Sequence, residues 1–169
     1  MQIDEAAPDF ELPDLQGRSH RLAADRGRIV ILNFWSCDCP HAIRTDTLLT
    51  RWQARWGEQV TLLPVASNAN ESLPAIAAAA ALRKLPTILL DRSQVVADRY
   101  EAHTTPHAFV IDADGCLRYR GAVDDTSFSR RRPNRYFLME AVEALLLGKS
   151  PEVQETTAYG CSIIRHALE

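Results

Sequence analysis

The chain has 169 residues, of which 46% are hydrophobic and 24% charged, and its formal net charge is -3. This length suits one domain with a single substantial core. The small acidic excess offers no basic footprint for nucleic acid, and no apolar run reaches the roughly 18 residues that span a bilayer. The acidic start, Met1 to Glu5, differs from the basic prelude of a secretory signal. We therefore expect a cytoplasmic protein without nucleic-acid or membrane partners, or a periplasmic one only if a leader has been removed.

The four cysteines are too few for a secreted scaffold held together by disulfides. In a reducing compartment, sparse cysteines are more often catalytic, redox-sensing or metal-binding. The composition therefore predicts reactive sulfur.

The chain order of the elements predicts an α/β domain. Phe10 and Leu12 alternate with acidic residues, and a turn from Pro13 to Gly17 precedes a possible return strand, which together predict a short N-terminal hairpin. Strand and helix patterns then alternate. Strands are expected over 29–35, 60–67, 87–90, 107–111 and 116–120, and helices over 40–56, 75–85 (capped by Ser72), 93–100 and from Asn134 to Gly148. The turn that ends at Gly115 joins two strands as an antiparallel hairpin, so the sheet should be mixed.

The helix expected after residue 40 should present one apolar face to the sheet. Ile43, Thr47, Leu48, Trp52 and Trp56 recur at spacings that keep them on one side of a helix. This pattern predicts that these five side chains face the core.

Two cysteines lie where the apolar strand 29–35 meets that helix. Pro40 suits the first helical position, because its missing N–H would have had no partner there. Cys39 then occupies the N-cap, where free amides and the positive end of the helix dipole favour thiolate over thiol. Such placement lowers the pKa of a cysteine, so Cys39 is the predicted nucleophile. Cys37 lies two residues earlier, outside the helix.

The element order resembles the thioredoxin superfamily. Residues 35–40 match its aromatic, cysteine and proline elements, and Thr105-Pro106 matches the position of its cis-proline. The segments APDFELPD, SNANES, TTPHAFVIDADG, LRYRGAVDD and YGCSI resemble a peroxiredoxin-like subgroup of redoxin-domain proteins. The resemblance implies a three-layer α/β fold with a central mixed sheet between helices. It also implies a redoxin domain over 1–150 and a tail over 151–169 that carries Cys161.

The chain departs from the usual motifs of these families at the cysteines. Only Asp38 separates Cys37 from Cys39, whereas thioredoxin-type enzymes have two residues between their cysteines. Ala42 occupies the position two residues beyond Pro40 that would hold a second cysteine. Residues 31–38 also contain neither the proline nor the threonine that precede a peroxidatic cysteine.

The main functional hypothesis is a thiol-disulfide oxidoreductase. Cys39 would attack a disulfide or an oxidised sulfur, and Cys37 or the tail residue Cys161 would resolve the adduct. Trp35 would shield the sulfur, and the loop at Pro106 would offer backbone groups to a substrate. Substrates would be protein or small-molecule disulfides or peroxides, and a thiol such as a thioredoxin would be the reductant. No cofactor is expected.

Three other functions fit the same residues. In a peroxide reductase, Cys39 would pass through sulfenic acid. In a metal-binding protein, Cys37, Cys39 and a histidine, taken from His41, His103 or His107, would hold Cu(I) or Zn(II), because sulfur and imidazole suit these ions. An inactive interaction module with a redoxin fold would show no redox chemistry.

Overall fold

The computed structural model describes residues 1–167. Its centre is a five-stranded sheet in the order β5-β4-β3-β7-β8. The bounds of these strands are β3 Ile29–Trp35, β4 Val60–Ala66, β5 Leu89–Leu90, β7 His107–Ile111 and β8 Leu117–Gly121. β3 runs parallel to β4 and antiparallel to β7, and β7 pairs antiparallel with β8. The predicted mixed sheet is therefore confirmed.

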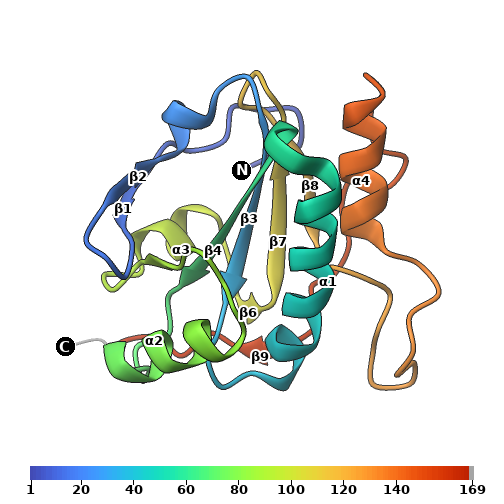
Figure 1. Cartoon of the computed structure of the whole chain (residues 1–169). Coiled ribbons are helices and arrows are strands. Elements are labelled where there is room, and N and C mark those ends of the chain that lie inside the picture. Colours follow the sequence, from blue (N-terminus) through green and yellow to red (C-terminus); the bar gives the residue numbers. More distant parts are fainter. Residues whose placement is uncertain (168–169) are drawn as a thin grey trace.

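Helices cover both faces of this sheet, as the three-layer prediction requires (Figure 1). One face carries α1 and α4, and the other carries α3 and the predicted N-terminal hairpin, β1 and β2. The bounds are α1 Pro40–Trp56, α2 Leu73–Leu82, α3 Val95–Arg99, α4 Phe137–Leu146, β1 Glu11–Pro13 and β2 Ser19–Arg21, with short 3-10 turns at Leu22–Asp25 and Gly57–Gln59. Within residues 1–167, no helix is long and apolar enough to cross a membrane.

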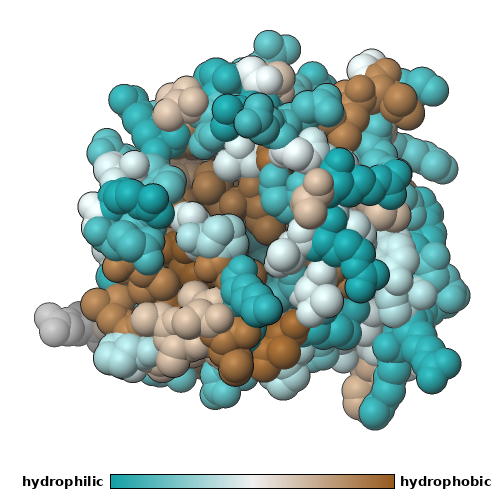
Figure 2. All heavy atoms as spheres, viewed as in Figure 1, coloured by the Kyte–Doolittle hydropathy of each residue, from teal (hydrophilic) through white to brown (hydrophobic). Residues whose placement is uncertain are grey.

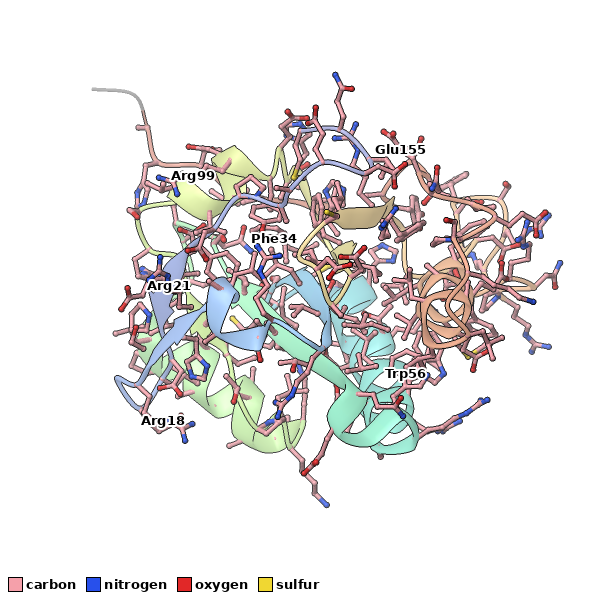
Figure 3. The ribbon with its side chains drawn as sticks, turned by 90° about the horizontal axis from the view of Figure 1, so that it is seen from above. Arg18, Arg21, Phe34, Trp56, Arg99 and Glu155 are labelled. Carbon is pink, nitrogen blue, oxygen red and sulfur yellow. The ribbon has the colours of Figure 1, made fainter. Side chains whose placement is uncertain are left out.

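β3 is buried along its whole length, and apart from Asn33 the side chains on both of its faces are apolar. Alternate residues of a strand point to opposite faces. Ile29 and Ile31 accordingly pack with α1 and α4, whereas Val30, Leu32 and Phe34 pack in the opposite core. In Figure 3, Phe34 lies near the middle of the molecule, while the labelled arginines of the N-terminal hairpin lie at its rim. The strand therefore fixes the position of the cysteines that follow it.

α2 packs at the end of the sheet where β3 and β4 finish. Ser72 caps it, accepting a hydrogen bond from the Ala75 amide at 3.3 Å, as predicted. The helix is apolar on every side, yet only Ile76 and Ala80 are fully buried in it. Leu82 is 83% exposed, and Figure 2 shows apolar residues gathered at the lower left, over α2.

The buried face of α1 differs from the predicted one. Ile43 is 47% exposed, whereas Ala42, Thr45 and Leu49 are buried. Ile43 lies one residue, or about 100°, away from this stripe. The prediction was wrong for Ile43 and also for Thr47, which is exposed, because a small residue and a polar residue occupy the contact with the sheet, and hydrophobicity alone does not identify them.

The sequence predicts that the last helix starts at Asn134, but Asn134 does not cap it. α4 begins at Phe137, with Tyr136 at its N-cap. The Asn134 amide instead donates to Oδ1 of Asp125 at 2.8 Å, and the Arg135 amide donates to the same oxygen at 3.2 Å. Asp125 thus holds these residues in the preceding loop.

The last described residues return across the open end of the sheet. β9 (Cys161–Ser162) pairs antiparallel with β6 (Thr104–Thr105) (Figure 1). The predicted boundary between domain and tail at residue 150 stays a prediction, and the last two residues of that tail lie outside the described part.

Candidate active site

Cys39 is the N-cap of α1. Its backbone is extended, Pro40 follows in the first turn, and its carbonyl accepts the first helical hydrogen bond, from the Ile43 amide, at 3.0 Å. The residue is only 1% exposed. Its sulfur therefore lies at a helix N-terminus, as predicted, but under a cover of other residues.

The cover comes from the cis-proline loop and the tail. The Thr105-Pro106 bond is cis, as the resemblance implies. The Thr105 carbonyl oxygen lies 3.0 Å from the Cys39 sulfur. In the register of β6 and β9, Cys161 stands opposite Thr105, and its sulfur lies 2.6 Å from that of Cys39. The structure thus brings the predicted nucleophile together with one of its two candidate partners.

The pKa values of the two thiols move in opposite directions. Burial alone would raise the pKa of Cys39, but hydrogen bonds from the Cys161 thiol and the Ala42 amide lower it below its usual value. Burial, together with the hydrogen bond to Cys39 and the charge on that sulfur, raises the pKa of Cys161 to about 12. The pair therefore favours a Cys39 thiolate that accepts a hydrogen bond from a Cys161 thiol.

Cys37 lies in a different environment. Burial, with a further contribution from the Glu71 carboxylate, raises the pKa of Cys37 to about 11. One oxygen of Glu71 accepts hydrogen bonds from the Cys37 amide at 3.1 Å, from the Ser36 hydroxyl and from the Asn68 side-chain amide at 3.1 Å. This buried carboxylate fixes the loop before Cys39 and disfavours a thiolate at Cys37.

Trp35 anchors the other side of the loop. Its indole N–H donates to Asp46 of α1 at 3.0 Å, and the Arg83 guanidinium lies 5.1 Å from the ring centroid. Arg83 also pairs with Asp46 at 3.0 Å and donates to the carbonyls of Ser36 and Cys37. Burial raises the pKa of Asp46 above its usual value. Trp35 packs in the same apolar cluster as Cys39, and its role in shielding the sulfur stays a prediction.

Polar side chains hold the tail beside the site. Oδ1 of the Asn68 side chain accepts a hydrogen bond from the Ile164 amide at 2.7 Å, and the Gln94 side-chain amide donates to the Ile164 carbonyl at 2.8 Å. Gly160 lies so close to the cis-proline loop that an added Cβ would stand 2.1 Å from the Thr105 oxygen. The position of Cys161 therefore depends on contacts on both sides of it.

The histidines do not join the cysteines in a metal site. His41 stacks edge-on against Tyr159, with ring centroids 4.9 Å apart, and His107 packs against Phe109 at 4.5 Å. Within residues 1–167, no three His, Cys, Asp or Glu side chains form a group that could hold a metal ion. The geometry gives no support to the copper or zinc hypothesis.

Sequence reasoning missed Glu71, Arg83 and Gly160. Glu71 lies in the SNANES segment and Gly160 in YGCSI, so the motifs marked their neighbourhoods without giving them roles. Arg83, just after α2, had no such signal, because a sequence does not distinguish a buried arginine from a solvated one.

A thiol pair beside a cis-proline, at the end of a mixed sheet between helix layers, defines a redox protein of the thioredoxin superfamily. A profile of the AhpC/TSA family matches residues 3–120, and the chain belongs to that family.

Curated relatives agree with this assignment. The chain is 30% identical over 116 residues to a thiol-disulfide oxidoreductase ResA from Geobacillus thermodenitrificans, covering 69% of this chain and 67% of the relative. It is 27% identical over 130 residues to a thiol:disulfide interchange protein DsbE from Allochromatium vinosum, covering 72% of this chain and 68% of the relative. The chain is a thiol-dependent oxidoreductase.

Solved structures extend the likeness to the tail. A hypothetical protein from Sinorhizobium meliloti has a TM-score of 0.89 at 27% identity, covering 99% of this chain and 96% of the other. An uncharacterized conserved protein from Geobacillus kaustophilus has a TM-score of 0.91 at 25% identity, covering 99% and 94%. These similarities span the whole fold, including its last segment.

Proposed function

We propose that the chain cycles between two thiols and a disulfide that joins Cys39 to Cys161. The 2.6 Å between their sulfur atoms is the observation that carries this proposal. Cys39 is the nucleophile, because its pKa is lowered below the usual value. Cys161 is the resolving thiol, presented by the pairing of β9 with β6.

The reaction needs the tail to open far enough for a substrate to reach Cys39. The Cys39 thiolate attacks one sulfur of a substrate disulfide, forms a mixed disulfide and expels the other sulfur as a thiolate. Cys161 then loses its proton and attacks the Cys39 sulfur, which releases the second substrate thiol. The protein is oxidised by two electrons and the substrate is reduced by two.

Loss of the Cys39 charge prepares the second step. The negative charge on Cys39 and the hydrogen bond to it contribute to the high pKa of Cys161. Both vanish when Cys39 is in a mixed disulfide, so the pKa of Cys161 falls at that moment. The resolving thiol is therefore held protonated until there is an adduct to resolve.

Cys37 is not the resolving thiol in this proposal. Burial and the Glu71 carboxylate raise its pKa to about 11 and would still act in a mixed disulfide on Cys39, unlike the Cys39 charge that raises the pKa of Cys161, and Glu71 holds the Cys37 backbone. A Cys37–Cys39 bridge would also have to close over a single intervening residue.

Mass spectrometry tests the pairing. Wild type and Cys37→Ser are oxidised with a small disulfide, free thiols are blocked, and linked peptides are identified. We expect a Cys39–Cys161 bridge in both proteins and none in Cys161→Ser. A Cys37–Cys39 bridge as the main product would contradict the assignment.

Peroxide reduction is the second candidate, and the AhpC/TSA family match favours testing it. In that reaction Cys39 would form sulfenic acid, and Cys161 would condense with it, releasing water. Peroxide consumption by wild type but not by Cys39→Ser would support this activity. An antioxidant role would follow from this activity, and both it and the cytoplasmic location stay predictions.

A further inference from the structure

The tail lies where another polypeptide would have to pair in order to reach Cys39. β9 occupies the edge of β6, and the Ile163 amide extends this pairing by donating to the His103 carbonyl at 2.9 Å. Ile163 itself is 6% exposed and packs in the main core. A strand edge that is already paired cannot accept a second strand.

Oxidation would hold this cover in place. In the disulfide of the proposed cycle, Cys161 is bonded to Cys39 and cannot leave β6 without breaking that bond, while the buried Ile163 side chain holds the residues that follow Cys161. The contact of Gly160 with Thr105 leaves no space for another chain between them. The oxidised protein is therefore closed to a partner that docks along β6.

The two sulfurs of that disulfide differ in access. Cys39 is 1% exposed, whereas Cys161 is only half-buried. A thiol that arrives from solvent meets Cys161 first. Attack there also expels the better leaving group, because a thiolate of lower pKa departs faster.

We propose that a low-molecular-weight thiol, attacking the Cys161 sulfur, reduces the oxidised pair, and that the tail excludes protein thiols that need the β6 edge. This inference rests on the proposed Cys39–Cys161 cycle and names the reductant class for its second half. The sequence predicts a thiol such as a thioredoxin as the reductant, and the inference replaces the thioredoxin with a small thiol.

The step balances with two equivalents of the thiol RSH. The first, as RS⁻, bonds to the Cys161 sulfur and breaks its bond to Cys39, which leaves as a thiolate at the N-terminus of α1. The second attacks the RS sulfur of this adduct, forms RSSR and releases Cys161, which takes up a proton. Two electrons pass from the thiols to the protein disulfide.

Quenched reactions of the 169-residue protein identify which sulfur the thiol attacks. The Cys39–Cys161 disulfide is first verified by mass spectrometry, and its absence would refute the proposed cycle rather than this inference. Oxidised protein then reacts briefly with substoichiometric glutathione, is quenched with acid and is mapped. We expect glutathione on Cys161. Glutathione mainly on Cys39 would overturn the inference.

Reduction rates test the exclusion of protein thiols. Oxidised wild type is reduced by glutathione or by thioredoxin. Each rate is divided by the concentration of the reductant's thiolate before the two are compared. We expect less than a tenfold advantage for thioredoxin, and an advantage of tenfold or more would overturn the inference.

Two paired variants test whether the tail is what excludes protein thiols. Ile163→Ala removes the buried tail anchor, and Ile164→Ala is the matched control because that neighbour is 47% exposed. Ile163→Ala should raise the thioredoxin rate at least tenfold over wild type, while the control stays within threefold. Equal effects of the two variants would contradict a role for the tail.

Discussion

At the scale of single residues, the site depends on how one thiol changes the other. The Cys161 thiol is a leading cause of the lowered pKa of Cys39, and Cys39 in turn raises the pKa of Cys161. Neither effect is available to an isolated cysteine at a helix N-terminus.

Removal of Cys161 should therefore destabilise the thiolate form of Cys39 relative to its thiol form. We expect Cys161→Ala to move the Cys39 titration toward higher pH, because the sulfur loses a hydrogen-bond donor. The thiolate absorbance near 240 nm, followed against pH, measures this change. Cys116→Ala is the control, since Cys116 lies near the N-terminal segment, opposite Ala6, and should leave the titration unchanged. An unchanged midpoint in Cys161→Ala would show that the helix alone sets the pKa.

The sequence identified Cys39 but could not choose its partner. A helix start is a local feature, so the strand, Pro40 and the N-cap were all readable. The contact with Cys161 joins residues 122 positions apart in the chain, and a local sequence pattern cannot predict contacts between such distant residues. Glu71 was missed for the same reason, because its burial depends on the packing of distant segments.

At the scale of elements, two strands of two residues each decide the geometry of the site. β6 and β9 are too short for a periodic pattern, although the family matches at Thr105-Pro106 and in the YGCSI segment indicated their neighbourhoods. The longer strands were predicted well, because apolar runs such as β3 make their burial evident.

Gly160→Ala should displace β9 from β6. The new methyl group would stand 2.1 Å from the Thr105 oxygen, so one backbone must move. Misplacement by about 1 Å can slow a positioned reaction on the order of a hundredfold. We expect Cys39–Cys161 bond formation to slow by at least about tenfold, measured by timed alkylation and mass spectrometry.

Gly17→Ala separates this effect from a general cost of replacing glycine. Gly17 has a positive φ and open space around it, so its substitution strains only the turn of the N-terminal hairpin. This control should form the disulfide at the wild-type rate. Equal rates in the two variants would mean that Gly160 does not position Cys161.

At the scale of the whole molecule, His107 should link stability to pH. Burial, reinforced by the charges of His103 and Arg120, lowers the pKa of His107 to about 4. Its unfolded pKa is about 6.5. The folded state thus favours neutral His107, and this contribution is fully present above pH 6.5 and is lost as pH falls to about 4. At most, about 3 kcal/mol of the free energy of unfolding is at stake.

Urea unfolding at several pH values measures this loss. His107→Phe keeps an aromatic ring beside Phe109 but cannot titrate. We expect its stability to fall less than that of wild type between pH 6.5 and 4. Parallel curves for the two proteins would assign the loss to the carboxylates instead.

A disulfide between Cys39 and Cys161 would also affect the stability of the fold. A covalent bond across 122 positions would restrict the unfolded chain far more than the folded one. In the chain-entropy account, a loop of this size contributes about 5 kcal/mol at 25 °C. For a chain of this length, that corresponds to a rise in Tm of about 10 to 20 °C. The Tm would then report the redox state of the protein. Because the bond stabilises the fold, the fold equally stabilises the bond, so the disulfide is harder to reduce in the folded protein than in the unfolded chain.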